Sequence, residues 1–147
     1  MSRKRKDPVV QFSVFTENRL GRLLEIFKMF KETGITIVAV TVLDTTDSSI
    51  IRLILDDPDK ARAMFEEHLI PYAETKVLAV EFDAMTQVPN VLASLLEAEI
   101  NIHYMYAFIS RPSSCSALAI NLEDADVAEQ ALGKAGFRVL GQGDITR

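Results

Sequence analysis

Apolar and polar residues alternate over Val9–Thr16, and this period of two gives way to a period of three to four over Leu20–Phe30. The first pattern predicts a β-strand and the second an amphipathic helix. Gly34 suits the residue that follows the end of such a helix. The corner between strand and helix, Glu17–Gly21, presents backbone N–H groups at the positive end of a helix dipole, so it is the candidate site for a small ligand.

The segments that follow complete one structural unit. Ile35–Leu43 and Ile50–Leu55 are rich in β-branched residues and flank a polar turn, which predicts a hairpin. Apolar residues then recur at helical spacing over Asp59–His68, where preceding acidic residues favour the helix dipole and His68 is expected to end the helix. A short strand over Ile70–Ala73 gives the order β-α-β-β-α-β, which is the split βαβ arrangement of ferredoxin-like folds.

The same order begins again at Lys76, so the chain is predicted to be a tandem repeat. Residues 34–37 (Gly-Ile-Thr-Ile) match residues 99–102 (Glu-Ile-Asn-Ile) at an offset of 65, and after the hairpin the offset becomes 67. We therefore predict an α+β protein in which each unit is an antiparallel sheet with both helices on one face. Its parts are a disordered basic tail (residues 1–7) and two ferredoxin-like units (residues 8–75 and 76–147).

Several strands are apolar on both sides, although the helices cover only one face of each sheet. Both alternating sets of Ile35–Leu43 are apolar, and Ile100–Ile109 carries Tyr104, Tyr106 and Phe108 on one side. Strands of this kind are usually buried on both sides. The second face is therefore covered by the sister unit, by a second chain or by a ligand, and we predict a homodimer formed through sheets or edge strands.

Composition changes this picture mainly by exclusion. The chain of 147 residues is 48% hydrophobic and 25% charged, and its net charge of −5 includes a basic run at residues 3–6, so the rest of the chain is more acidic still. An acidic body argues against nucleic-acid binding. No segment approaches the roughly 18 consecutive apolar residues that span a bilayer. We expect a cytoplasmic protein that binds neither nucleic acid nor membrane.

Residues that carry chemistry are few. The two histidines lie far apart and Cys115 is the single cysteine, so the sequence has no disulfide pair and no spacing typical of a metal site. Because Cys115 falls in an apolar strand, we expect a buried, unreactive thiol. No Ser-His-Asp or Cys-His set, P-loop or dinucleotide motif can be assembled. The sequence therefore predicts a protein that is not an enzyme and holds no metal or cofactor.

The two consecutive units resemble ACT domains, the small regulatory modules that bind amino acids. Residues 17–21 (Glu-Asn-Arg-Leu-Gly) are similar to the Glu-Asn-Arg-Pro-Gly corner of that family, with leucine where proline is usual. Residues 99–102 are similar to the family's Gly-Ile-Asn-Ile segment, with Glu99 in place of glycine. The resemblance covers nearly the whole chain from Pro8 onward.

The resemblance implies that an amino acid is held between adjacent domains by the corner and by the start of the second strand. Because Thr86 stands where the first unit has Gly21, we expect the first corner to bind and the second to be structural or to supply side chains. The implied binding residues are Thr16, Asn18, Arg19, Leu20, Gly21 and Thr36 in the first unit and Asp83, Thr86 and Asn101 in the second.

Two functions of different classes follow from this reading. The first is a stand-alone tandem ACT protein that senses an amino acid or related metabolite and couples its binding to the assembly of domains or of a partner. The second is a ligand-free ACT pair that serves as a regulatory subunit or oligomerisation module for an enzyme of amino-acid metabolism, as in the regulatory subunits of acetolactate synthase.

Overall fold

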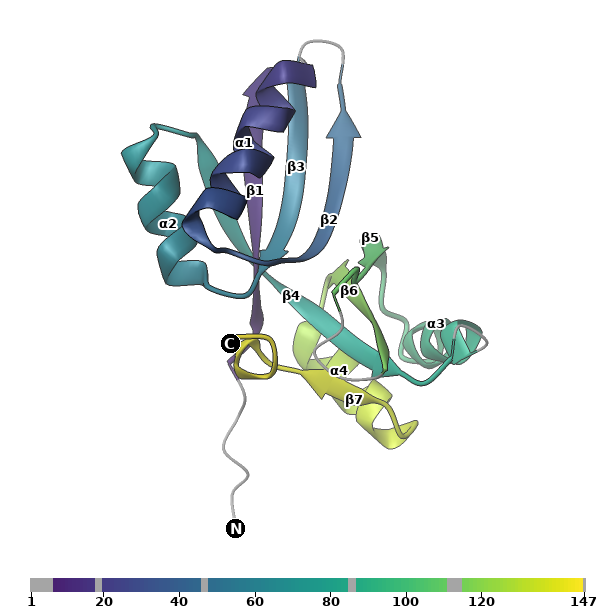
Figure 1. Cartoon of the computed structure of the whole chain (residues 1–147). Coiled ribbons are helices and arrows are strands. Elements are labelled where there is room, and N and C mark those ends of the chain that lie inside the picture. The colour runs from purple at the N-terminus through teal and green to yellow at the C-terminus, as the bar shows by residue number, and fades with distance from the viewer. Residues whose placement is uncertain (1–6, 18–19, 46–47, 85–86, 111–114, 147) are drawn as a thin grey trace.

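The computed structural model describes residues 7–17, 20–45, 48–84, 87–110 and 115–146. Within these residues lie four α-helices, seven β-strands and one short 3-10 helix, η2 (Figure 1). In chain order the elements are β1 (Val9–Glu17), α1 (Leu20–Thr33), β2 (Ile37–Asp44), β3 (Ser48–Leu55), α2 (Pro58–Glu67), β4 (Tyr72–Phe82), α3 (Val88–Glu97), β5 (Ile102–Ala107), β6 (Ser116–Leu122), α4 (Ala125–Lys134), β7 (Arg138–Leu140) and η2 (Gln142–Asp144).

The strands form two antiparallel groups that share β4. Its first part, Tyr72–Val77, pairs with β1, and its second part, Leu78–Phe82, pairs with β6, while Ala79–Glu81 also pairs with β7. The strand order is therefore β2-β3-β1-β4 in the first unit and β5-β6-β4-β7 in the second. Both orders belong to a ferredoxin-like βαββαβ unit, so the predicted fold is confirmed.

One predicted strand is wrong in its extent. Of the short strand expected over Ile70–Ala73, only Tyr72 and Ala73 are in a strand, as the first two residues of the 11-residue β4, which is long because Tyr72–Phe82 contains no Gly or Pro that would interrupt it. The chain thus passes from one unit to the next along β4 itself, as Figure 1 shows. The boundary predicted between residues 75 and 76 lies inside this strand, just before its pairing partners change.

Asp7, the last residue of the predicted disordered tail, is hydrogen-bonded to the folded part of the chain. Residues 1–6 lie outside the described residues, but the Asp7 carbonyl accepts a 2.9 Å hydrogen bond from the Gln142 N–H. The Gln142 side chain in turn accepts a 2.9 Å bond from the Val10 N–H. These two bonds join the start of β1 to η2 near the end of the chain.

All four helices end in the same way, and these ends mark the repeat. Each is followed by a residue with positive φ, and the next residue donates its N–H to a helical carbonyl five positions earlier. The positive-φ residues at offset 65 are Gly34 (78°) and Glu99 (57°), and those at offset 67 are Leu69 (55°) and Gly136 (90°). Both predicted offsets are therefore confirmed.

The starts of α2 and α4 also correspond. The Asp57 carboxylate accepts a 3.1 Å hydrogen bond from the Lys60 N–H, and the Asp124 carboxylate accepts one of 3.2 Å from the Val127 N–H. These acidic residues therefore act as N-caps in addition to favouring the helix dipole. His68 is the C-cap of α2, which confirms its predicted place.

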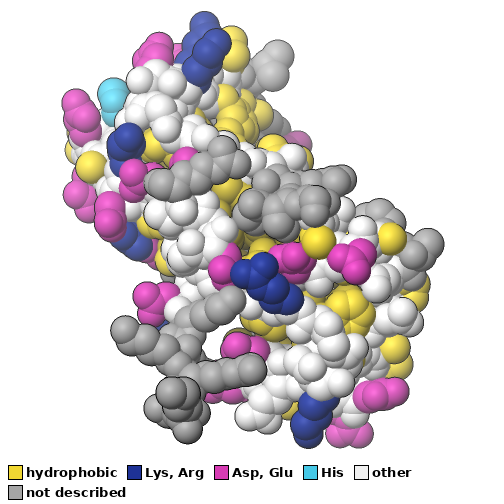
Figure 2. Space-filling view, turned by 60° about the horizontal axis from the view of Figure 1, so that its bottom comes forward, with side chains coloured by type: hydrophobic (Ala, Val, Ile, Leu, Met, Phe, Trp, Pro, Cys, Tyr) yellow, Lys and Arg dark blue, Asp and Glu magenta, His cyan; other side chains and the backbone are white. Residues whose placement is uncertain are grey.

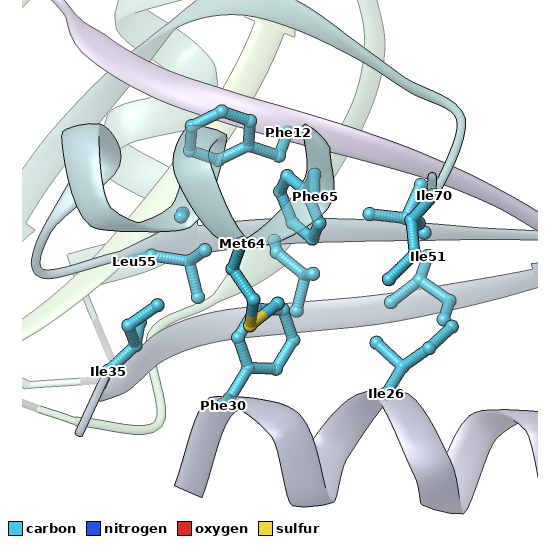
Figure 3. Packing of buried hydrophobic residues seen from close by; sticks show 12 residues of the cluster. Phe12, Ile26, Phe30, Ile35, Ile51, Leu55, Met64, Phe65 and Ile70 are labelled. Carbon is cyan, nitrogen blue, oxygen red and sulfur yellow. The ribbon is translucent and has the colours of Figure 1, made fainter. Parts of the chain in front are cut away.

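Each unit has a core between its helices and its sheet. In the first unit, Phe12 of β1 and Phe30 of α1 both meet Phe65 of α2 edge-on, with ring centroids 5.5 and 5.9 Å from that of Phe65. Figure 3 shows these rings among aliphatic side chains from both helices and the sheet. The second unit has an equivalent core that includes Val91 and Leu95 of α3. Neither core covers the other face of its sheet.

The sister unit covers part of that other face. Val38 and Ala39 of β2 are buried in one cluster with Phe108 of the second unit. The N–H groups of Ile109 and Ser110 both donate to the Val38 carbonyl, at 2.8 and 3.1 Å. The sister unit is therefore one of the covers that the sequence leaves open.

A buried polar group fastens this contact between the units. Gln11 of β1 is fully buried, and its amide donates to the Tyr104 hydroxyl at 2.7 Å and accepts from the Tyr106 hydroxyl at 2.6 Å. The Arg52 guanidinium lies 3.9 Å from the centroid of the Tyr104 ring, which is a cation–π contact. Burial raises the pKa of Tyr106, so this phenol stays protonated and remains a donor.

Candidate functional site

The first corner joins the end of β1 to the start of α1. β1 ends at Glu17 and α1 begins at Leu20, while Asn18, Arg19 and the side chain of Leu20 lie outside what the structure describes. Gly21 is in the first turn of α1, and a Cβ built on it would meet no atom of the described residues within 4 Å beyond its chain neighbours and its own helix. This glycine therefore leaves the first-turn N–H groups open to approach, and such groups attract anions.

The Thr16 hydroxyl at this corner has no hydrogen-bond partner among the described residues. Its side chain lies on the helix-facing side of β1, as those of Phe12 and Val14 do. Its hydroxyl oxygen is buried, and no described residue makes a hydrogen bond with it. Because a buried hydroxyl without a partner costs stability, such groups are rare and call for an explanation.

Thr36 lies at the opposite end of the first unit from this corner. Ile37 pairs with Leu55 of β3 whereas Glu17 pairs with Ser48, so the two sites are about 20 Å apart along the sheet. The Thr36 N–H donates to the Asp56 carboxylate at 2.8 Å, and the Asp56 N–H donates to the Thr36 carbonyl at 3.1 Å. The structure thus separates Thr36 from Thr16 within one chain.

Asn101 repeats this arrangement in the second unit. Its side-chain amide donates to the Glu123 carboxylate at 3.1 Å, and the Glu123 N–H donates to the Asn101 carbonyl at 3.2 Å. Asn101 and Thr36 therefore both fasten the start of a strand to the loop before a helix. The two acidic partners, Asp56 and Glu123, directly precede the N-caps Asp57 and Asp124. From the sequence alone, these acidic pairs are explained only by their interaction with the helix dipole.

The second corner is closed by its own side chains. Thr86 lies outside the described residues, but the Gln87 side chain accepts hydrogen bonds from the Asp83 N–H at 2.7 Å and from the Ala84 N–H at 3.4 Å. Gln87 was not among the predicted site residues, because nothing in the sequence marks a glutamine as a clamp for a turn. The Asp83 carboxylate accepts a 3.2 Å hydrogen bond from the Cys115 thiol.

Cys115 is only partly buried, which corrects the prediction that it lies inside an apolar strand. It precedes the first residue of β6, so the apolar run that follows it is buried while the cysteine is not. Its hydrogen bonds to Asp83 and Glu81 raise the pKa of the thiol. The thiol is therefore protonated near neutral pH. Because the thiolate is the reactive form of cysteine, the expected low reactivity follows from this protonation and not from burial.

The described surface and side chains give little support for a nucleic-acid, metal or membrane site. On the face shown in Figure 2, basic side chains are scattered over both units and acidic side chains lie among them, unlike the continuous basic patch of a nucleic-acid interface. Among the described residues no group of three or more His, Cys, Asp or Glu is placed to hold a metal ion. No helix in the described part of the chain is long and apolar enough to cross a membrane.

Two ferredoxin-like units that share a strand, with a strand-to-helix corner in each, define a tandem ferredoxin-like protein. The chain belongs to the ACT domain pair family, whose sequence model matches residues 8–132. The resemblance to ACT domains is thereby confirmed. No curated protein matches the chain.

Solved structures share the fold. Protein BT0572 from Bacteroides thetaiotaomicron is 24% identical, with a TM-score of 0.86 over 97% of this chain and 98% of that chain. The regulatory subunit of aspartate kinase from Thermus thermophilus, in its ligand-free form, is 14% identical, with a TM-score of 0.62 over 88% of this chain and 91% of that chain. The corresponding subunit from Thermus flavus is also 14% identical, with a TM-score of 0.57 and coverage of 90% and 95%.

Proposed function

We propose that this ACT domain pair is a non-catalytic regulatory protein that binds an amino acid or related metabolite at its first corner. The observation that carries the proposal is the buried Thr16 hydroxyl, which has no partner among the described residues. Membership of the family supports a regulatory role. Two structures of the same fold are named as regulatory subunits of aspartate kinase, which agrees with this role.

The first turn of α1 is the place for the ligand's carboxylate. Its N–H groups lack intrahelical acceptors and lie at the positive end of the helix dipole. Gly21 leaves them open, and the first turn contains no acidic side chain that would repel an anion. Thr16 then offers its hydroxyl to the bound molecule, and Asn18 is expected to contribute its side-chain amide.

We expect the protein to be a homodimer whose second copy lies beside the first corner. On the sheet face away from the helices, Phe15 and Leu43 both lie opposite Ile50 of β3. Phe15 is 43% exposed and Leu43 46% exposed. This apolar row continues the face that the second unit covers further along the same strands. Because Glu17 is two residues beyond Phe15, a copy packed on the row would reach the corner and place the ligand at an interface.

A regulatory subunit of a partner enzyme is the second candidate. Leu96 of α3 and Val127 of α4 are 77% and 42% exposed on the helical side of the second unit, where they offer apolar area to a partner. A stoichiometric complex with one enzyme of amino-acid metabolism, recovered without added ligand, would favour this candidate over sensing.

Isothermal titration calorimetry against the twenty amino acids tests the proposal. We expect at least one to bind with a dissociation constant below about 1 mM, and we expect Thr16→Val and Asn18→Ala to weaken it about tenfold or more. Thr41→Val is the matched control, because Thr41 is a strand threonine opposite Arg52 on the other sheet face. The proposal fails if no amino acid binds in this range, or if Thr41→Val weakens binding as much as Thr16→Val.

A further inference from the structure

The sheet face of the first unit that points away from the helices carries opposite charges on the two sides of the apolar row Phe15, Ile50 and Leu43. Glu17 lies two residues beyond Phe15 on β1, and Arg52 lies two residues beyond Ile50 on β3. Strand residues two apart point to the same face, so these side chains share it. Because β1 and β3 are antiparallel and Phe15 pairs with Ile50, the two charges lie on opposite sides of the row.

The Arg52 side chain is partly buried among neutral groups. In the sheet register its neighbours are Ser13 on β1 and Thr41 on β2, and its guanidinium lies 3.9 Å from the centroid of the Tyr104 ring of the second unit. The described residues form no salt bridge with Arg52. Because a charge that is withdrawn from water and left unpaired costs free energy, this position favours a bound anion.

The contact with Tyr104 also orients the guanidinium. An arginine that stacks on a ring keeps N–H donors around the edge of its guanidinium, where a carboxylate can bind. The Tyr104 hydroxyl accepts a 2.7 Å hydrogen bond from the buried Gln11 side chain, so the ring itself is fixed by the contact between the units. The donors of Arg52 are therefore oriented in advance, which lowers the entropic cost of binding a partner.

Glu17 of a second copy supplies the matching carboxylate. Glu17 is exposed at the end of β1. Within one chain, Glu17 and Ser13, the neighbour of Arg52, are four residues apart on β1, which is about 13 Å along the strand. The two opposite charges are thus held apart in each chain and are available to meet between two chains.

Symmetry determines which charges meet when two copies pack through this face. Sheets that pack face to face lie about 10 Å apart, and the two-fold axis of a symmetric pair lies between them. An axis along the apolar row reverses the strand direction and places Glu17 of the second copy over Ser13, directly beside Arg52. An axis parallel to the strands would put equal charges at the same level. Because like charges across an interface repel, the charge pattern favours the axis along the row.

We propose that a second copy binds this face in the antiparallel orientation, with Glu17 of each copy paired with Arg52 of the other. The apolar row forms the centre of the interface, and two symmetry-related ion pairs flank it. The inference rests on the homodimer of the proposed function and deepens it, because it assigns the orientation of the copies and the residues that fix it. The pairing also connects the strand end before the first corner of one copy to the contact between the units of the other.

Charge reversal in the full chain tests this pairing. In Arg52→Glu two carboxylates meet at each flank of the interface, and in Glu17→Arg two guanidinium groups meet there. We expect either change alone to raise the dimer dissociation constant at least about tenfold in sedimentation experiments. An equimolar mixture of the two variants should form a heterodimer, because both flanks then combine a positive with a negative side chain. Native mass spectrometry with one variant ¹⁵N-labelled identifies this species.

Lys28→Glu and Glu32→Arg are the matched control pair. Both residues are exposed on α1, which covers the other face of the first sheet. Each change alone should leave the dimer unchanged, and their mixture should show no preference for the heterodimer. The variant Glu17→Arg/Arg52→Gln keeps the test independent of the folding of Arg52→Glu. Because it removes the repelled guanidinium, it should recover part of the affinity that Glu17→Arg loses.

The outcomes separate this inference from the function on which it rests. Single variants that dimerise as well as the wild type, or a mixture that stays monomeric, would overturn the pairing of Arg52 with Glu17 and leave the wild-type homodimer standing. A monomeric wild type would overturn both the pairing and the homodimer. Calorimetry measures amino-acid binding at the first corner independently of both.

Discussion

The Tyr106 hydroxyl donates a 2.6 Å hydrogen bond to the Gln11 side chain and thereby ties β5 of the second unit to β1 of the first. Gln11 is fully buried, so loss of this donor leaves an amide oxygen without a partner. We expect Tyr106→Phe to lower the free energy of unfolding by about 1–3 kcal/mol in urea denaturation. The Gln11→Leu/Tyr106→Phe double variant should lose less than the sum of the two single changes, and strict additivity would show that the pair is not coupled.

The same tyrosine predicts how stability depends on alkaline pH. Burial raises the pKa of Tyr106 above its ordinary value of about 10, so the unfolded chain releases this proton at a lower pH than the folded chain does. The stabilisation is complete below about pH 10 and falls above it, by up to about 1.4 kcal/mol per pH unit. Urea unfolding between pH 9 and 11 should show a shallower fall for Tyr106→Phe than for the wild type, and parallel curves would contradict the assignment.

Leu69 stores strain at the end of α2. It has a φ of 55° and is 87% exposed. Its left-handed conformation therefore costs free energy that burial of the side chain does not offset. Leu69→Gly should raise the free energy of unfolding by about 1 kcal/mol. Leu69→Ala should give little change, because alanine keeps the strain, and Gly136→Ala should lower stability at the corresponding position of the second unit. Equal effects of Leu69→Gly and Leu69→Ala would refute the strain.

Asp56 and Glu123 allow the two units to be compared directly. Asp56 is 9% exposed and its carboxylate accepts the Thr36 N–H, whereas Glu123 is exposed and binds the Asn101 side chain. We expect Asp56→Ala to cost about 1–3 kcal/mol and Glu123→Ala less than about 1 kcal/mol. Thermal and urea unfolding of both variants provide the measurement, and the reverse order would contradict the burial argument.

The apolar row Phe15, Ile50 and Leu43 predicts the oligomeric state. We expect sedimentation of the wild type as a dimer at micromolar concentration and of Phe15→Asp as a species near the chain mass of 16.4 kDa. Leu96→Asp is the control, since Leu96 is more exposed but lies on a helix of the second unit. A monomeric wild type, or dissociation by Leu96→Asp alone, would be evidence against an interface on this row.

The repeat and the fold could be predicted because they depend on local patterns that occur twice. The repeat aligns Glu99 with Gly34, and the structure gives both residues a positive φ. The continuity of β4 could not be predicted, because the local pattern predicts one strand over Ile70–Ala73 and a separate unit that begins at Lys76. Whether two adjacent strands merge is decided by pairing with β1, β6 and β7, which the local pattern does not contain.

The candidate sites could be predicted less well from the sequence than the fold could. Thr36 was assigned by family resemblance, and only the strand register places it far from Thr16 in one chain. The unpartnered Thr16 hydroxyl likewise emerges only when the buried atoms are accounted for one by one.

A crystal structure of the full chain with its tightest-binding amino acid tests the central claim most directly. We predict the ligand at the first corner, with its carboxylate about 3 Å from first-turn N–H groups of α1 and a polar atom within hydrogen-bond distance of the Thr16 hydroxyl. A complex in which this corner is empty, while the same amino acid occupies another part of the molecule, would contradict the proposed site.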